Sequence, residues 1–554
     1  MKMSHNSDLE KVSSPHSHLK MSAPRESAVK KGDHGSHDAE GQGAPQTDQP
    51  EAPRYRQPDN QHAADYGENG MWLEDFENYK TGGYHPVHIG DVLDGRYEVA
   101  HKLGCGGYAM IWLCQDTVAL SWKAVKIHLA IHSSEASPEI TLKKTLGDSQ
   151  FVTVPERHFW IEGPNGRHLA LVLPVLGPSV LRTRSLVSDI ATIHKVCRQI
   201  AEALHFFHDK DICHGDFRPS NILHRMHSID SMSKEQLWEL LGAPSSVEHY
   251  APISTIKGDD PSPHAPRYAV RSVDLRRLQD WIIVDEITVI DLGVAFEISK
   301  PTEGSGIPAA YAAPELLFDE SVGCDTRPTP SLSSDIWSFA WSMIQLYTGQ
   351  EVYYGNTRDA VGSMEYYLGP MSEEYRETYI RKHPAPSQTE DQGELGDYNS
   401  EGDEYDDYDY EDQYNCEWPV VPVDTRRDDY YFVWKAKDLQ QERKKLMITG
   451  YADLLHAKLG EKLNLGGFGF AKEQSYCLPR HEVVQLSDLL RRMLRYKPEE
   501  RLSATEVLDH PWFVNHGRKP QLMAANDTSL PQDVKTKLQE LMNLLRNNTQ
   551  STLM

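Results

Sequence analysis

The spacing of apolar residues changes once along this chain, near Pro178, and this change limits the possible folds more than any other feature. Between residues 97 and 122, apolar and β-branched side chains alternate with polar ones around a glycine cluster, which is the period of β-strands, and we expect the part from 97 to about 176 to be β-rich. One short helix is expected in this part, near Glu139. From residue 190 to 207, apolar residues recur in steps of three and four, which predicts one long amphipathic helix. The sequence therefore predicts an α+β fold, with a β-rich part followed by a mainly helical part.

Composition sets the limits of the folded region. Residues 1–90 are rich in Ser, His, Gly, Pro, Gln and charge, so we expect a disordered N-terminal arm. The folded domain is expected over residues 97–513, followed by a C-terminal tail over 514–554. Two segments interrupt the domain: an insertion at about 224–285, and an acidic, tyrosine-rich loop at about 384–417 that repels itself too strongly to pack.

Two short motifs predict helix starts inside and after these segments. Ser233 with Gln236 has the spacing of a capping box, in which the two side chains satisfy backbone N–H groups of the first turn. Ser503 with Glu506 has the same spacing. We therefore expect one helix within the insertion and another near the end of the domain.

The charge and the cysteines restrict the partners. A formal net charge of -25 argues against direct nucleic-acid binding and favours basic peptide partners, although acidity that only maintains solubility is an equal alternative. No apolar run approaches the ~20 residues of a membrane-spanning helix, so no membrane association is expected. The seven cysteines form no C-x-x-C pair, which favours a reducing compartment, cytoplasmic or nuclear. We expect a monomer.

The segment most informative about chemistry follows the long predicted helix. Residues 214–221 read HGDFRPSN and precede a short apolar strand. This segment resembles the catalytic loop of protein kinases, in which an aspartate accepts the hydroxyl proton and an asparagine ligates magnesium. The resemblance assigns these roles to Asp216 and Asn221, and it assigns neutralisation of the transferred phosphate to Arg218, where the family usually has lysine. The structural alternative for Asp216 is an ordinary helix-ending turn.

A second segment adds a metal ligand. Residues 289–293 form an apolar strand that ends in Asp-Leu-Gly, which resembles the metal-binding Asp-Phe-Gly of kinases. The resemblance implies that Asp291 ligates Mg²⁺ between the β- and γ-phosphates of ATP.

The nucleotide site is predicted in the strand-rich part. Residues 103–111 resemble the glycine-rich loop over the phosphates, with Ala109 in place of its last glycine. Lys126 follows at kinase spacing and is expected to contact the α- and β-phosphates, while Glu139, with Glu135 as the alternative, is expected to pair with it. Adenine is expected beside residues 171–177. The residues predicted to bind ATP are Leu103, Gly104, Cys105, Gly106, Gly107, Ile111, Ala124, Lys126, Pro174 and Leu176.

Small-molecule kinases of the choline and aminoglycoside type also contain H-G-D followed by asparagine. Two downstream features resemble protein kinases instead. Residues 311–315 resemble the end of a protein kinase activation segment, and Glu315 is expected to form a buried ion pair with Arg501. Residues 334–339 resemble the buried helix that anchors the catalytic loop.

Within protein kinases, the chain most resembles the SR-protein kinase family and its fungal relatives. The cues are HGDFRPSN at 214–221, GPNGRH at 163–168, GIP at 306–308 and the long insertion. The resemblance implies a two-lobed fold and an ATP- and Mg²⁺-dependent serine/threonine kinase, and Ser/Arg-rich substrates follow by analogy only. The alternative is a catalytically silent scaffold with the same fold, which Ala109 and Ala312 keep open.

Overall fold

The computed structural model describes residues 55–56, 73–183, 190–246, 249–275, 283–301, 306–318, 329–349, single positions between 364 and 378, and 454–460, 463–465 and 474–516. The predicted acidic loop at 384–417 lies outside the described residues, as does the tail beyond residue 516. No described helix combines the length and the apolar character that a membrane crossing requires.

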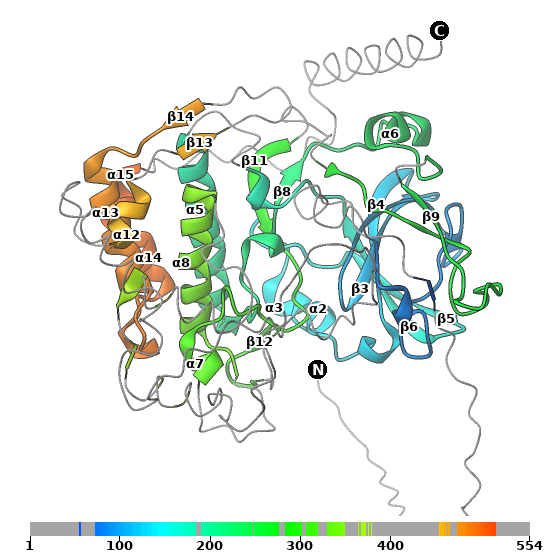
Figure 1. The fold of residues 1–554 in the computed structure, drawn as a ribbon, viewed down its shortest axis with the longest axis horizontal. Coiled ribbons are helices and arrows are strands. Elements are labelled where there is room, and N and C mark those ends of the chain that lie inside the picture. The colour runs from blue at the N-terminus through cyan, green and yellow to red at the C-terminus, as the bar shows by residue number, and fades with distance from the viewer. Residues whose placement is uncertain are drawn as a thin grey trace, which may run out of the picture. The chain divides into compact units, whose positions relative to one another are not determined.

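An antiparallel sheet of six strands forms the N-lobe (Figure 1). Its spatial order is β1-β2-β3-β4-β6-β5. Its strands are β1 (Val92–Leu93), β2 (Tyr97–Cys105), β3 (Ala109–Asp116), β4 (Ser121–His128), β5 (Arg157–Gly163) and β6 (Gly166–Pro174). Two short helices, α2 (Pro138–Thr141) and α3 (Lys143–Leu146), connect β4 to β5. The predicted strand-rich part and the short helix at Glu139 are confirmed.

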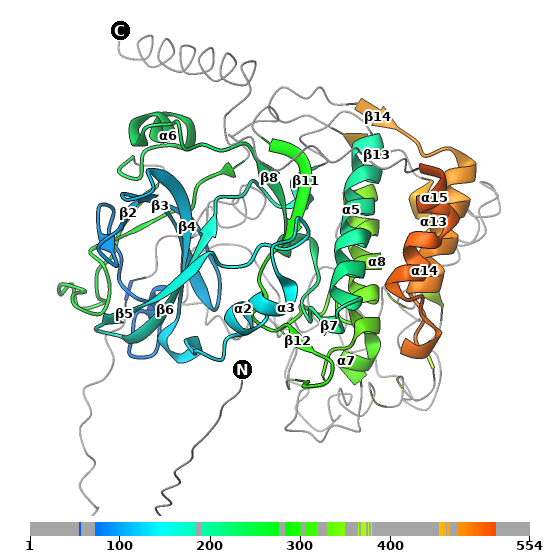
Figure 2. The same cartoon turned by 180° about the vertical axis from the view of Figure 1, so that it is seen from behind.

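Helices α5 (Ile190–His208) and α8 (Leu332–Thr348) pack side by side in the core of the C-lobe (Figures 1 and 2). Helix α5 is the predicted amphipathic helix, and its apolar face is buried at three- and four-residue steps. The other C-lobe helices are α7 (Pro314–Phe318), α12 (Leu454–Leu459), α13 (Arg480–Met493), α14 (Ala504–Asp509) and α15 (Pro511–His516).

Four pairs of short antiparallel strands complete the described structure. They are β7 (Ile212–Cys213) with β12 (Phe296–Glu297), β8 (Ile222–Met226) with β11 (Ile283–Val289), β9 (Tyr250–Pro252) with β10 (Tyr268–Val270), and β13 (Leu463–Leu465) with β14 (Gln474–Tyr476). The β8–β11 pair matters most for function, because it joins the ends of the two predicted catalytic segments.

The predicted capping boxes both form. Ser233 and Gln236 exchange their hydrogen bonds at the start of α6 (Lys234–Leu241), and Ser503 and Glu506 do so at the start of α14. In both, the serine hydroxyl accepts from the backbone N–H three residues later.

The insertion leaves and re-enters the C-lobe through β8 and β11, yet its middle packs on the N-lobe sheet. The indole of Trp122 donates to the carbonyl of Met232, and that of Trp238 donates to the carbonyl of Ala100, both at 3.0 Å. The insertion therefore forms a second connection between the two lobes.

The predicted arm over residues 1–90 is wrong for residues 73–90. Phe76, Tyr79 and Tyr84 of this segment are buried against the sheet. Glu74 forms a buried ion pair with Lys102 of β2. The composition averaged over residues 1–90 is polar and does not reveal these few aromatic side chains. Their large apolar area is enough to hold the segment on the sheet although the residues around them are polar.

Candidate active site

A buried carboxylate holds the predicted catalytic loop in place. Asp335, in the first turn of α8, accepts hydrogen bonds from the backbone N–H groups of His214 (2.8 Å) and Gly215 (3.0 Å). Nε2 of His208, the last residue of α5, lies 3.3 Å from the same carboxylate. The loop is thus fixed to both central helices of the C-lobe, which supports the predicted anchoring role of residues 334–339.

Asp216 and its neighbours on the loop form one hydrogen-bonded group. Arg218 Nε donates to Oδ1 of Asp216 at 2.9 Å, and Asn221 Nδ2 donates to Oδ2 at 2.7 Å. Burial raises the pKa of Asp216, and the positive charge of Arg218 only partly offsets this effect. Asp216 is therefore an oriented carboxylate and a stronger base than an exposed aspartate, as a proton acceptor requires.

Asp291 follows β11 and lies beside this loop. The backbone N–H of Ile290 donates to the carbonyl of Asn221 at 2.9 Å, and Nε2 of His214 lies 3.1 Å from the carbonyl of Ile290. Asp291 has a left-handed backbone with φ of 63°, a conformation that aspartate tolerates better than most residues. Its side chain is 42% exposed, so it is accessible to a ligand.

Lys126 of β4 meets two carboxylates. Its Nζ donates to Oε1 of Glu139 at 2.9 Å and to Oδ1 of Asp291 at 2.7 Å. The structure thus places Glu139 beside Lys126, whereas Glu135 accepts a hydrogen bond from the indole of Trp160. Burial acts to lower the pKa of Lys126, but the two carboxylates outweigh it and raise the pKa above its ordinary value.

The pKa values of both carboxylates fall below their ordinary range. In each case burial acts to raise the pKa, and the ammonium of Lys126 overcomes it. The charged forms of Glu139 and Asp291 are therefore favoured at neutral pH.

His128 is a site residue that belongs to none of the sequence motifs. Its Nε2 lies 3.0 Å from Oε2 of Glu139, a close contact without hydrogen-bond alignment. A signal for it existed in the sequence, because His128 stands two residues after Lys126 on a strand and side chains at that spacing share one face.

The glycine-rich loop joins β2 to β3. A Cβ added to Gly104, Gly106 or Gly107 would meet no atom within 4 Å, so these backbone units border open space that a ligand can approach closely. The backbone N–H of Gly106 donates to the carbonyl of Ala109, and the hydroxyl of Tyr84 donates to the carbonyl of Gly106 at 2.9 Å. Tyr84, which lies in the segment predicted to be disordered, thus contacts the glycine-rich loop directly.

The remaining predicted nucleotide residues lie on the same sheet or directly after its strand β6. Cys105 ends β2, and Ile111 of β3 is the register partner of Gly104. Ala124 is buried on β4, Pro174 ends β6, and two further predicted contacts, Leu103 and Leu176, are half-buried. Cys105, Ile111 and Ala124 thus lie on the strands that carry the glycine-rich loop and Lys126, whereas Pro174 ends the neighbouring strand β6 and Leu176 follows it.

The donor set fits ATP with Mg²⁺. Open glycine backbone and a lysine suit phosphate oxygens, while the Asp291 carboxylate and the Asn221 amide oxygen are hard ligands of the kind Mg²⁺ prefers. Lys126, Asp291 and Asn221 would hold the nucleotide and its metal.

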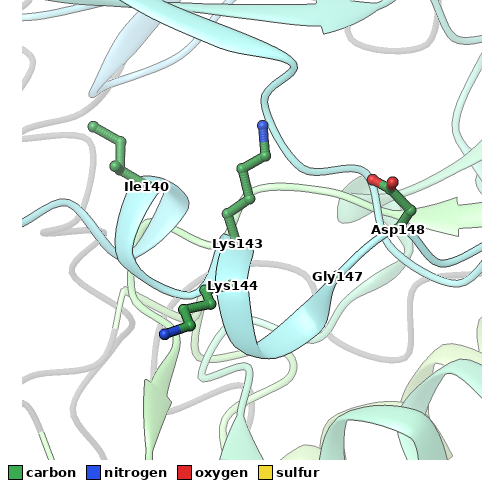
Figure 3. Close-up of a pocket in the computed structure, with 5 residues that line it drawn as sticks. All are labelled: Ile140, Lys143, Lys144, Gly147 and Asp148. Atoms are coloured by element: carbon green, nitrogen blue, oxygen red, sulfur yellow. The ribbon is translucent and has the colours of Figure 1, made fainter. Parts of the chain in front are cut away.

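A separate surface pocket lies on the short helices α2 and α3. It has a volume of about 420 Å³ and is lined by Ile140, Lys143, Lys144, Gly147 and Asp148 (Figure 3). None of the predicted site residues lines it, so it is distinct from the candidate active site.

A six-stranded antiparallel sheet whose Lys126 pairs with Glu139 of helix α2, joined to a helical lobe that carries an anchored Asp-Asn loop, defines a protein kinase fold. The family described as protein kinase domain matches residues 279–513. Serine/threonine-protein kinase spk-1 of Caenorhabditis elegans is 37% identical in a match that covers 30% of this chain and 17% of the relative's length. SRSF protein kinase 3 of Homo sapiens is 38% identical in a match that covers 27% of this chain and 29% of the relative's length.

Serine/threonine-protein kinase SRPK of Physarum polycephalum is similar over a longer region, with 24% identity over 80% of this chain and 91% of its own. The matches to the first two relatives span less than a third of their lengths. The chain therefore contains a protein kinase domain whose relatives are SRPK-family serine/threonine kinases, as the sequence predicted.

Proposed function

We propose that this protein is an ATP-dependent protein serine/threonine kinase. One arrangement carries the proposal: Asp216 is hydrogen-bonded to Arg218 and Asn221, and on the other side of the site Lys126 is paired with Glu139 and Asp291. Kinases need both groups in place, because phosphoryl transfer depends on positioning and on charge stabilisation.

The roles of the side chains follow from their chemistry. ATP with Mg²⁺, when bound, supplies the phosphoryl group and neutralises part of its charge. Asp216 accepts the proton of the substrate hydroxyl, and its raised pKa strengthens it as a base. Arg218 offers positive charge near the transferred group, and Lys126 orients the α- and β-phosphates.

The decisive experiment measures transfer of labelled γ-phosphate to a serine-containing protein. Asp216→Asn should reduce transfer about a hundredfold or more, because it removes the general base. Asp509→Asn, at an exposed aspartate at the end of α14, is the matched control and should be as active as wild type. Equal incorporation by wild type and Asp216→Asn, together with intact ATP binding, would instead support the alternative of a nucleotide-binding scaffold.

We also propose that the substrates are basic and Ser/Arg-rich. The net charge of -25 and the similarity to kinases named for SRSF and SRPK support this choice. An arginine-rich serine peptide should be phosphorylated faster than a neutral one, and the preference should shrink as added salt shortens the Debye length below ~8–10 Å. Equal rates at low salt would contradict the proposal.

We propose that the protein acts as a monomer in the cytoplasm or the nucleus. Cysteines with free thiols among the described residues, such as Cys114 and Cys197, support a reducing compartment. Imaging of the tagged full chain and light scattering of the purified protein test the two parts of this proposal.

A further inference from the structure

Two side chains of strand β4, those of Lys126 and His128, contact the carboxylate of Glu139. Lys126 and His128 are two residues apart and therefore project from one face of the strand. Lys126 Nζ bonds Oε1 of Glu139 at 2.9 Å, and His128 Nε2 lies 3.0 Å from Oε2. The side chains of His128 and Glu139 are only 8% and 5% exposed, so water does not replace this contact.

The helix that carries Glu139 is too short to hold the carboxylate by itself. Helix α2 has four residues, begins with Pro138, and is preceded by Ser137, whose side chain makes no capping hydrogen bond. A helix of one turn has little intrinsic stability. Its glutamate is therefore positioned mainly by the groups that contact it from β4.

The backbone of His128 contacts a further histidine. Its backbone carbonyl lies 2.9 Å from Nδ1 of His168, whose ring contacts that of His85 with 5.0 Å between centroids. Burial lowers the pKa of His168, and it lowers the pKa of His85 to about 4, so both rings are neutral at pH 7. The charged groups facing His128 are thus Glu139, the neighbouring Lys126 and, across the site, Asp291.

We infer that His128 is a positioning residue, which fixes the second oxygen of Glu139 and so keeps the first oxygen in place for Lys126. The inference rests on the proposed kinase function. Without His128 the carboxylate of Glu139 can rotate away from Lys126, and the ammonium is then held by Asp291 alone, so it is no longer oriented toward phosphate. The expected defect is in nucleotide binding, not in recognition of the protein substrate.

The first test replaces His128 by valine and by glutamine in the full chain. His128→Val should raise the dissociation constant for Mg-ATP and the KM for ATP about tenfold, with the peptide KM unchanged. His128→Gln should restore both values to within about twofold of wild type, because its amide nitrogen occupies the place of Nε2. His158→Val is the matched control, since it removes an exposed histidine 3.7 Å from Glu135 and should change neither value.

The second test is a double-mutant cycle with Glu139→Gln. If His128 acts through Glu139, His128→Val should have almost no further effect on ATP binding in the Glu139→Gln background. Additive effects, or a valine variant that binds ATP as well as His158→Val does, would overturn the inference. So would a glutamine variant as impaired as the valine variant.

A substitute variant covers the case in which His128→Val does not fold. His128→Asn then replaces it, because the asparagine amide mimics Nδ1 and not Nε2, and it should weaken ATP binding whereas His128→Gln should not. Equal ATP affinities of the asparagine and glutamine variants would overturn the inference. ATP binding is measured by calorimetry without a protein substrate. A chain that transfers no phosphate but shows the predicted binding pattern would refute the proposed kinase activity and still support the role of His128.

Discussion

Arg501 and Glu315 form a two-pronged ion pair, with Nη1–Oε1 at 2.7 Å and Nη2–Oε2 at 2.6 Å. The guanidinium also lies over the ring of Trp337, 5.0 Å from its centroid, and donates to the carbonyl of Ser333. The pair was expected from the sequence and is formed. It connects α7, at the end of the activation segment, to the turn before α14.

We expect this pair to be essential for the stability of the C-lobe. Glu315→Ala should lower the free energy of unfolding by about 3 kcal/mol, because it leaves a fully buried guanidinium without its carboxylate. Urea denaturation measures the loss. Glu500→Ala, which removes an exposed ion pair with Lys497, should cost less than about 1 kcal/mol, and a similar loss in both variants would contradict the assignment.

The pH dependence of turnover should identify Asp216 as the group on the acidic side. Activity requires its carboxylate, and burial raises its pKa, so turnover should fall as pH decreases through that raised value. Glu139 and Asp291, whose pKa values are lowered, remain charged over the same range.

Arg218→Met provides the test, because it removes a positive charge that lowers the pKa of Asp216. The acidic limb of kcat should then move to higher pH. A limb that stays in place, or moves to lower pH, would mean that another group controls it.

Metal dependence should require Asp291. Mg²⁺ with ATP should raise the melting temperature of the wild-type chain, and EDTA should cancel most of that rise, because ligands stabilise the state that binds them. Asp291→Ala should show the same small ATP effect with and without Mg²⁺. A full metal-dependent rise in this variant would place the metal ligands elsewhere.

Tyr84 should affect nucleotide binding although it lies outside the predicted domain. Tyr84→Phe removes the hydrogen bond to the carbonyl of Gly106, and the freed glycine-rich loop should raise the KM for ATP about fivefold, equivalent to roughly 1 kcal/mol. Tyr250→Phe, at an exposed tyrosine, is the control. The KM for ATP of both variants is measured by steady-state kinetics at saturating peptide. Equal KM values for Tyr84→Phe and Tyr250→Phe would exclude a role of Tyr84 in the loop.

Much of the fold could be predicted because it depends on local sequence patterns. The strands, helix α5 and the capping boxes depend on period and on neighbouring residues. Motif spacing limited the partner of Lys126 to Glu139 or Glu135, and the structure places Glu139 there. The packing of residues 73–90 could not be predicted, since it depends on the shape of a sheet formed by later residues. The contact of His128 with Glu139 does not follow from any motif, although the position of His128 on the strand indicates the correct face.

The buried pair of Glu74 and Lys102 determines where this protein can be cut. A truncated chain beginning at Tyr97 would keep every catalytic motif and five of the six strands, but it would lose β1 and Glu74, and the ammonium of Lys102 beside the ring of Trp112 would have no counter-charge. Breaking a buried pair in this way costs about 3–5 kcal/mol, a large part of the stability of a typical domain. We therefore expect a stable folding unit to include Glu74, which lies far upstream of residue 279, where the match to the protein kinase family model begins.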